Sequence, residues 1–154
     1  MPLPPFQAAV DENRDALARF LVATVGPQEA DDCLQETLLS ALRAYPSLRA
    51  GSNVRAWLFT IARNKALDEH RARARRPVPV AEAESGGSVA LAEDGDEELW
   101  VAVRSLPPKQ RAAVVLRFVN DFSHRDVARV LDCSEEAARR SLHEGLSKLR
   151  EEVG

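Results

Sequence analysis

The side chains best suited to bind a polyanion gather in one stretch of the chain, residues 43–76. This stretch holds 9 basic and 2 acidic residues, whereas residues 77–99 hold 0 basic and 7 acidic residues. The net charge of −3 for the whole chain hides this segregation. Because clustered arginines attract phosphates, the basic stretch predicts a contact with nucleic acid.

No arrangement of residues supports catalysis. His70, His124 and His143 are scattered, there is no Gly-rich phosphate loop, and no acidic pair is set for acid–base work. Cys33 and Cys133 both fall on apolar faces, which favours core thiols in a reducing cytoplasm over a disulfide or a metal site. We therefore expect a protein that is not an enzyme and that uses no cofactor and no metal.

The chain has 154 residues, which suits one domain or two small ones. No apolar run approaches the length of a membrane span or of a signal-peptide core. These features predict a cytoplasmic protein without a membrane contact.

Two helices are expected before the basic stretch. The first covers residues 6–25, and Gly26-Pro27 separates it from the second, residues 28–45. The second helix has one apolar face at helical spacing, predicted to be buried: Ala30, Cys33, Leu34, Thr37, Leu38, Ala41, Leu42 and Tyr45. Its opposite face carries Asp32, Gln35, Glu36, Leu39 and Arg43. This is either a solvated face or, because Leu39 lies among polar groups, a protein contact.

A third helix is predicted from Ser52 or Asn53, either of which can cap it, to Arg76. Its first half is apolar on more than one side and should pack among other helices. Its second half carries Lys65, Arg71, Arg73, Arg75 and Arg76. The residues alone leave two interpretations, a core helix with a solvated tail and a helix that binds nucleic acid with its basic end.

The rest of the chain, from residue 77 on, is predicted to form a linker followed by a helix-turn-helix. Residues 77–98 combine prolines, Gly86-Gly87 and acidic side chains, a composition typical of a flexible tether. Beyond them, Ser123 and Asp126 form a capping-box-like start to a short helix. Asp132-Cys133-Ser134 supplies the turn, and Ser134 caps a last helix whose Ala138, Leu142 and Leu149 face the core.

Three sequence motifs in the chain resemble those of bacterial extracytoplasmic-function sigma factors, the small two-domain proteins that direct RNA polymerase to promoters. N-x-R-A-W-L-F-x-I-A-R-N-x-x-x-D-x-x-R, from Asn53 to Arg71, resembles their second domain, as does D-x-x-Q-E, from Asp32 to Glu36. L-P-P-K-Q-R and the helix-turn-helix after it resemble their fourth domain. The resemblance implies an all-α chain with two small helical domains, residues 1–76 and 99–154, joined by the flexible acidic linker 77–98.

The resemblance also implies partners, namely core RNA polymerase and promoter DNA. Asp32, Gln35, Glu36 and Leu39 would dock on the β′ clamp helices of the polymerase, whose β subunit is a further expected contact. The −10 element would be opened and held by Asn53, Arg55, Arg63, Arg71 and Arg75, with Asn53 and Arg55 on the strand and the others on phosphates. The −35 element would be read by Glu136, Arg139, Arg140 and His143 from the last helix.

In the last helix, the chain departs from the residues that are usual in this family. It has Ala137-Ala138 where Thr-Val is usual, and Glu144 and Leu146 where basic residues are usual. Fewer cations leave open a second interpretation, a sigma-like decoy that binds an anti-sigma protein without productive DNA binding. A free-standing helix-turn-helix repressor is a third, but it would leave D-x-x-Q-E unexplained. An anti-sigma protein is therefore a further candidate partner.

Overall fold

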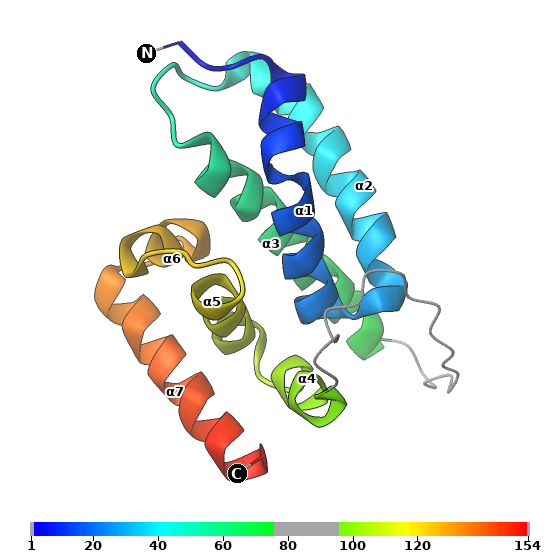
Figure 1. Cartoon of the computed structure of the whole chain (residues 1–154), viewed down its shortest axis with the longest axis vertical. Coiled ribbons are helices and arrows are strands. Elements are labelled where there is room, and N and C mark those ends of the chain that lie inside the picture. Colours follow the sequence, from blue (N-terminus) through cyan, green and yellow to red (C-terminus); the bar gives the residue numbers. More distant parts are fainter. Residues whose placement is uncertain (1, 76–95, 154) are drawn as a thin grey trace.

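The computed structural model describes residues 2–75 and 96–153, and every regular element within them is a helix (Figure 1). The first half contains α1 (Phe6–Val25), α2 (Pro27–Ala44), the 3-10 turn η1 (Tyr45–Ser47) and α3 (Val54–Arg75). The second half contains α4 (Glu97–Arg104), α5 (Pro108–Phe118), α6 (His124–Leu131) and α7 (Glu135–Val153). The predicted all-α fold is confirmed.

Local signals set the ends of these helices. Gly26 has a positive φ of 93°, ends α1 with its N–H on the Val22 carbonyl, and leaves Pro27 as the first residue of α2. Asn53 caps α3, because its side-chain oxygen accepts a hydrogen bond from the N–H of Ala56 at 3.0 Å. The 3-10 turn around Pro46 ends the second helix, so that Tyr45 lies just beyond the α-helix rather than in its last turn.

The helix-turn-helix forms as the sequence predicts. Ser123 accepts from the N–H of Asp126 at 3.1 Å and Ser134 accepts from the N–H of Ala137 at 3.0 Å, so both helices are capped. Between them Asp132 adopts a left-handed conformation with φ of 56°. Asp tolerates this region better than most residues, which explains how the turn forms without the more usual Gly.

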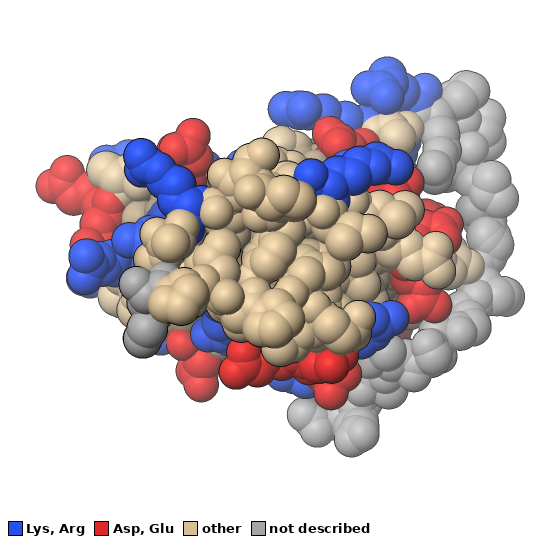
Figure 2. Space-filling view, turned by 90° about the horizontal axis from the view of Figure 1, so that it is seen from above, with Lys and Arg blue, Asp and Glu red and all other residues tan. Residues whose placement is uncertain are grey.

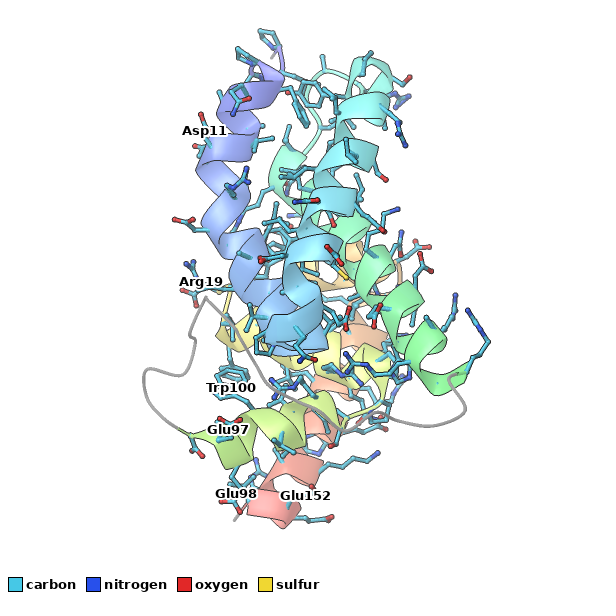
Figure 3. The ribbon with its side chains drawn as sticks, turned by 90° about the vertical axis from the view of Figure 1, so that its right-hand side faces the viewer. Asp11, Arg19, Glu97, Glu98, Trp100 and Glu152 are labelled. Atoms are coloured by element: carbon cyan, nitrogen blue, oxygen red, sulfur yellow. The ribbon has the colours of Figure 1, made fainter. Side chains whose placement is uncertain are left out.

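The predicted linker 77–98 lies mostly outside the described residues. Its last part is described, and Asp96 caps α4 by accepting from the N–H of Leu99 at 3.2 Å. The fourth helix therefore begins at Glu97, two residues before the expected boundary, and ends at Arg104. Trp100 is half-buried and rises from α4 toward the side of α1 that carries Arg19 (Figure 3).

The two halves pack against each other and share one apolar core. Phe20 of α1 stacks edge-on against Phe59 of α3 with ring centroids 5.6 Å apart, and Phe59 in turn meets Phe122, between α5 and α6, at 4.8 Å. Edge-to-face pairs of this kind are favourable beyond the area they bury. We call this contact between the halves the interdomain seam; its side chains are Arg55, Phe59, Arg63, Arg111, Asn120 and Phe122.

Hydrogen bonds to backbone carbonyls fix the halves in this closed arrangement. Asn120 is 3% exposed, and its side-chain amide donates to the carbonyl of Ala16 at 3.0 Å. Arg55 donates to the carbonyl of Asn120 at 2.9 Å. A buried donor that loses its partner costs about 1–3 kcal/mol, so these bonds favour one relative position of the halves.

Both cysteines are free thiols. Cys33 is buried on α2, and burial raises the pKa of its thiol to about 11, with Glu69 and Glu36 adding to the effect. The predicted core role is confirmed for Cys33, whose thiol stays protonated and unreactive at neutral pH. Cys133 is half-buried in the turn between α6 and α7.

Helices α5 and α7 approach closely at Gly145. A Cβ atom there would lie 2.9 Å from Cγ2 of Val114 and 3.4 Å from the carbonyl oxygen of Gln110. We expect Gly145→Leu to lower the free energy of unfolding by about 1–3 kcal/mol, because the branched side chain overpacks this contact. Urea unfolding followed by circular dichroism measures the loss. Lys148→Leu, at an exposed position of the same helix, is the control and should leave stability nearly unchanged.

Candidate polymerase and nucleic-acid interfaces

The outer face of α2 presents all four residues predicted to bind the polymerase. Asp32, Gln35 and Glu36 are exposed, and Leu39 keeps 51% of its surface accessible. The prediction that Leu42 faces the core is wrong, because Leu42 is 53% exposed. It lies three residues beyond Leu39 and so on the same side of the helix. The result is an apolar pair beside a rim of acidic and amide groups, an arrangement common in protein–protein interfaces.

The residues predicted to hold the −10 strand lie along α3 but in two environments. Asn53, Arg71 and Arg75 are exposed at the two ends of the helix. Arg63 is half-buried, and burial lowers the pKa of its guanidinium, against opposing effects of Cys133 and Asp132 in the helix-turn-helix. The middle of this surface is therefore covered by the second half of the chain.

Arg55 is exposed, but its guanidinium also contacts residues of the interdomain seam. Besides its hydrogen bond to Asn120, its guanidinium carbon lies 4.3 Å from the centroid of the Phe122 ring and 5.7 Å from that of Phe59. A guanidinium over an aromatic face is attracted by the ring quadrupole. Trp57 is half-buried, and its ring centroid lies 5.9 Å from that of Tyr45.

The helix predicted to read DNA has its four named residues on the outside. Glu136, Arg139, Arg140 and His143 are all exposed, while Ala138 and Leu142 on the other side are buried. Arg139 forms an ion pair with Glu135 at 3.2 Å, one helical turn earlier. An exposed ion pair of this kind contributes little to stability. Arg139 can therefore leave Glu135 and bind an anionic ligand instead.

Charge is mixed on the end of the molecule that Figure 2 shows. Lys, Arg, Asp and Glu lie around its rim, and its centre is a broad area of uncharged residues. On this face the basic residues therefore do not form one uninterrupted positive surface. No group of three or more His, Cys, Asp and Glu side chains in residues 2–75 and 96–153 is placed to hold a metal ion.

Comparisons with known proteins agree with both halves. The family described as sigma-70 region 2 matches residues 9–76, and the family described as sigma-70 region 4 matches residues 96–149. The ECF RNA polymerase sigma factor EcfG of Rhodopseudomonas palustris is 36% identical over 141 residues, which span 87% of this chain and 77% of the relative. The chain belongs to the ECF family of RNA polymerase sigma factors.

Further relatives and solved structures agree with the assignment of this chain to the sigma factor family. CarQ of Myxococcus xanthus is 35% identical over 131 residues, covering 81% of this chain and 75% of CarQ. The structure of RpoE in complex with the anti-sigma factor NepR from Bartonella quintana has a TM-score of 0.76 at 27% identity and covers 96% of each chain. CnrH, solved with the cytosolic domain of CnrY, shares the fold, with a TM-score of 0.71 at 24% identity over 94% of this chain and 84% of CnrH.

Membership of the family defines the activity class. Sigma factors are initiation factors rather than enzymes, and this sigma factor acts in promoter-directed transcription. Within the described residues, no helix has both the length and the apolar character needed to cross a membrane.

Sequence reasoning missed three residues of the interdomain seam: Arg111, Asn120 and Phe122. A basic residue after two prolines resembles a solvated or phosphate-binding side chain, yet Arg111 is 7% exposed. Phe122 offered a weak signal, since it is a large aromatic residue in an otherwise polar loop between two helices. A large apolar side chain at such a position is usually buried against another element.

Proposed function

We propose that the outer face of α2 is the surface by which this sigma factor binds core RNA polymerase, through the β′ clamp helices. The proposal rests on the exposure of Leu39 beside Asp32, Gln35 and Glu36. Leu42 extends the apolar part of the same surface. Partner sites commonly combine an apolar anchor with a polar rim that excludes water from it. We also infer a cytoplasmic location for the protein, because that compartment fits this partner.

The double variant Asp32→Ala, Gln35→Ala is expected to bind core polymerase roughly 10-fold more weakly, since truncating an interface hot spot costs more than about 1 kcal/mol. Fluorescence anisotropy with labelled protein measures the affinity. The matched control is Gln7→Ala, Asp11→Ala, which removes an exposed amide–carboxylate pair from α1. Wild-type affinity in the first variant, with unchanged helix content, would remove the assignment.

The DNA contacts divide between the two halves. We infer that Asn53, Arg55, Arg63, Arg71 and Arg75 hold the opened −10 strand, and that Glu136, Arg139, Arg140 and His143 read the −35 duplex. Pulling a base out of the stack costs a few kcal/mol, which contacts to the single strand must recover. Arg55 and Arg63 are engaged at the seam in the closed arrangement. Separation of the halves would free both side chains from these contacts, and we propose that it accompanies binding to the polymerase and its β subunit.

Run-off transcription tests the proposed function directly. Purified protein added to core polymerase on fragmented genomic DNA should yield discrete transcripts that core polymerase alone does not produce. A sigma-like decoy would bind an anti-sigma protein and yield none. The exposed Arg139 and Arg140 on α7 favour the sigma factor over the decoy. An anti-sigma partner remains part of the proposal, because the similar RpoE is solved with its anti-sigma factor.

A further inference from the structure

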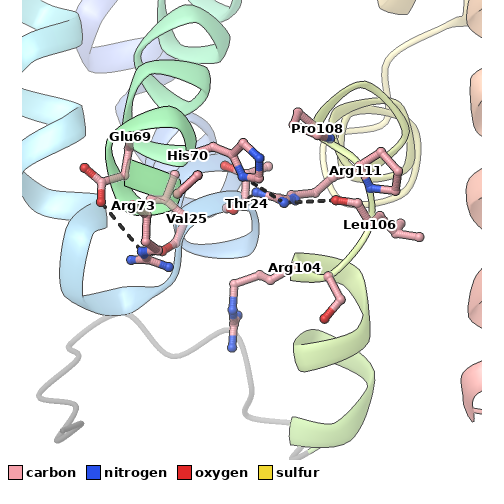
Figure 4. Close-up of a pocket in the computed structure, with 12 residues that line it drawn as sticks. Thr24, Val25, Glu69, His70, Arg73, Arg104, Leu106, Pro108 and Arg111 are labelled. Atoms are coloured by element: carbon pink, nitrogen blue, oxygen red, sulfur yellow. Dashed lines mark hydrogen bonds and ion pairs between the residues drawn. The ribbon is translucent and has the colours of Figure 1, made fainter. Parts of the chain in front are cut away.

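A cavity of about 550 Å³ lies between the two halves, at the C-terminal ends of α1 and α3 and against α4 and α5 (Figure 4). None of its lining residues is among those assigned above to polymerase or promoter, although it adjoins Arg71 and Arg75 on α3. Five ionisable side chains line it: Glu69, His70, Arg73, Arg104 and Arg111. Three guanidinium groups therefore face one carboxylate. The cavity volume falls within the range of about 300–1,000 Å³ that holds small molecules and cofactors.

Arg111 is a buried cation held by neutral groups. It is 7% exposed and donates to the carbonyls of Thr24 and Leu106, each at 2.9 Å, and it meets Nδ1 of His70 at 3.5 Å. Its Nε is buried without a hydrogen-bond partner. No ion pair joins Arg111 to a carboxylate within residues 2–75 and 96–153. A buried charge without a counter-ion is costly, so an anion beside it would be stabilising.

Arg104 is the cation of the cavity that has the fewest constraints. It is half-buried and makes no hydrogen bond or ion pair with any described residue. Burial lowers the pKa of its guanidinium, and Arg73 lowers that pKa further, while Glu97 opposes the shift. Figure 4 shows its side chain extending from α4 toward the first half, where Cδ and Nε lie next to Gly26. The side chain is placed to close on a ligand between α4 and α3.

Arg73 already has acidic neighbours. Its guanidinium lies 3.8 Å from Glu29 and 3.8 Å from Glu69, and it donates to the carbonyl of Val25 at 3.4 Å. The pKa of His70 is lowered, first by burial and then by Arg111 and Arg73, which favours the neutral imidazole. The unmatched positive charge of the cavity is therefore that of Arg104 and Arg111, both of which come from the second half.

We propose that this cavity binds a small oligophosphate anion, a nucleotide or a free phosphate chain, that bridges Arg104 and Arg111 of the second half to α3 of the first. Arg104 can pair with phosphate oxygens through its free N–H donors. Arg111 has its Nη groups on carbonyls and contributes its charge and its unpartnered Nε, so the two arginines together suit a ligand with more than one negative charge. Helix ends from both halves line the site, and its volume suits a ligand much smaller than a nucleic-acid duplex. Because the ligand would contact both halves, its binding stabilises the closed arrangement and couples a small metabolite to the availability of Arg55 and Arg63.

Isothermal titration calorimetry of the full chain with inorganic triphosphate, at low ionic strength, tests the proposal. We expect saturable binding of one triphosphate per chain and a rise in the thermal unfolding midpoint. Arg104→Gln should weaken binding roughly 10- to 100-fold, the range of a charged hydrogen bond. Because Arg104 holds no described partner, this variant keeps the fold. Arg14→Gln, at an exposed position of α1, is the matched control and should bind as the wild type does.

Three results would overturn the proposal. One is the absence of saturable binding to the wild-type chain. Another is an equal loss in Arg14→Gln and Arg104→Gln, which would indicate diffuse attraction to the whole surface. ATP and triphosphate share the phosphate chain and should compete for one site, so the third is displacement of triphosphate by adenosine alone. None of these measurements involves polymerase or DNA, so they fail or succeed independently of the proposed function.

Discussion

Phe122→Ala is expected to separate the two halves of this sigma factor while leaving each half folded. Phe122 is 2% exposed, and its ring packs on Phe59 and under the guanidinium of Arg55. Removing a buried phenyl ring costs about 3–5 kcal/mol. For each 1.4 kcal/mol by which the variant weakens the contact between the halves, the equilibrium between the closed and open arrangements shifts tenfold. Small-angle X-ray scattering should therefore show a larger radius of gyration.

Opening should also free the residues of α3 that we propose bind DNA. We expect Phe122→Ala to bind single-stranded −10 DNA more tightly than the wild type, because Arg55 and Arg63 no longer contact the second half. Phe118→Ala is the matched control, since Phe118 lies at the end of α5 with 61% of its surface exposed. A scattering profile of Phe122→Ala identical to that of Phe118→Ala would show that this ring does not hold the halves together.

Asn120→Ala provides an independent test of the same seam. Its side-chain amide donates to the carbonyl of Ala16, across 104 positions of sequence. The replacement removes a bond between the halves and leaves the packing of α5 on α7 in place. It should increase the open population in the same direction as Phe122→Ala and by a smaller factor, because a hydrogen bond contributes less than a buried ring.

The helices could be predicted because their signals are local. Gly26-Pro27, the caps Asn53, Ser123 and Ser134, and the spacing of apolar residues each act within a few positions of the chain. Periodicity fixes which residues share a face, but it does not say which face another element covers. Leu42 shows the difference, because it fits the apolar stripe of α2 and yet is 53% exposed.

The arrangement of the halves could not be predicted, since it depends on pairs far apart in sequence. Arg111 bonds to the carbonyl of Thr24 across 87 positions, and Arg55 bonds to that of Asn120 across 65. Backbone carbonyls accept these bonds, so the sequence at the accepting position carries no trace of the contact. The sequence motif predicts Arg55 and Arg63 as DNA contacts, but it holds no information on which residues of the second half contact them in the free protein.

The two groups of arginines are expected to affect promoter binding in different ways. Arg139 and Arg140 lie early in α7, exposed, where side chains of a recognition helix reach base edges. Arginine bidentate to guanine discriminates by about 1–3 kcal/mol, so Arg139→Ala or Arg140→Ala should weaken a promoter with a matching −35 element roughly 5- to 150-fold. The same variants should have little effect on a promoter whose −35 element is scrambled.

Arginines of the basic end of α3 should instead act on all sequences alike. Arg71 and Arg75 are exposed there, and each phosphate contact that they make releases a counter-ion. Replacing both by alanine should lower the affinity of the holoenzyme for matched and scrambled promoters by the same factor. It should also reduce the slope of log K against log salt by about 2, close to one unit for each lost contact. Binding measured across a salt series on both templates separates the two groups, and an equal loss on both templates in Arg139→Ala and Arg140→Ala would show that α7 does not read sequence.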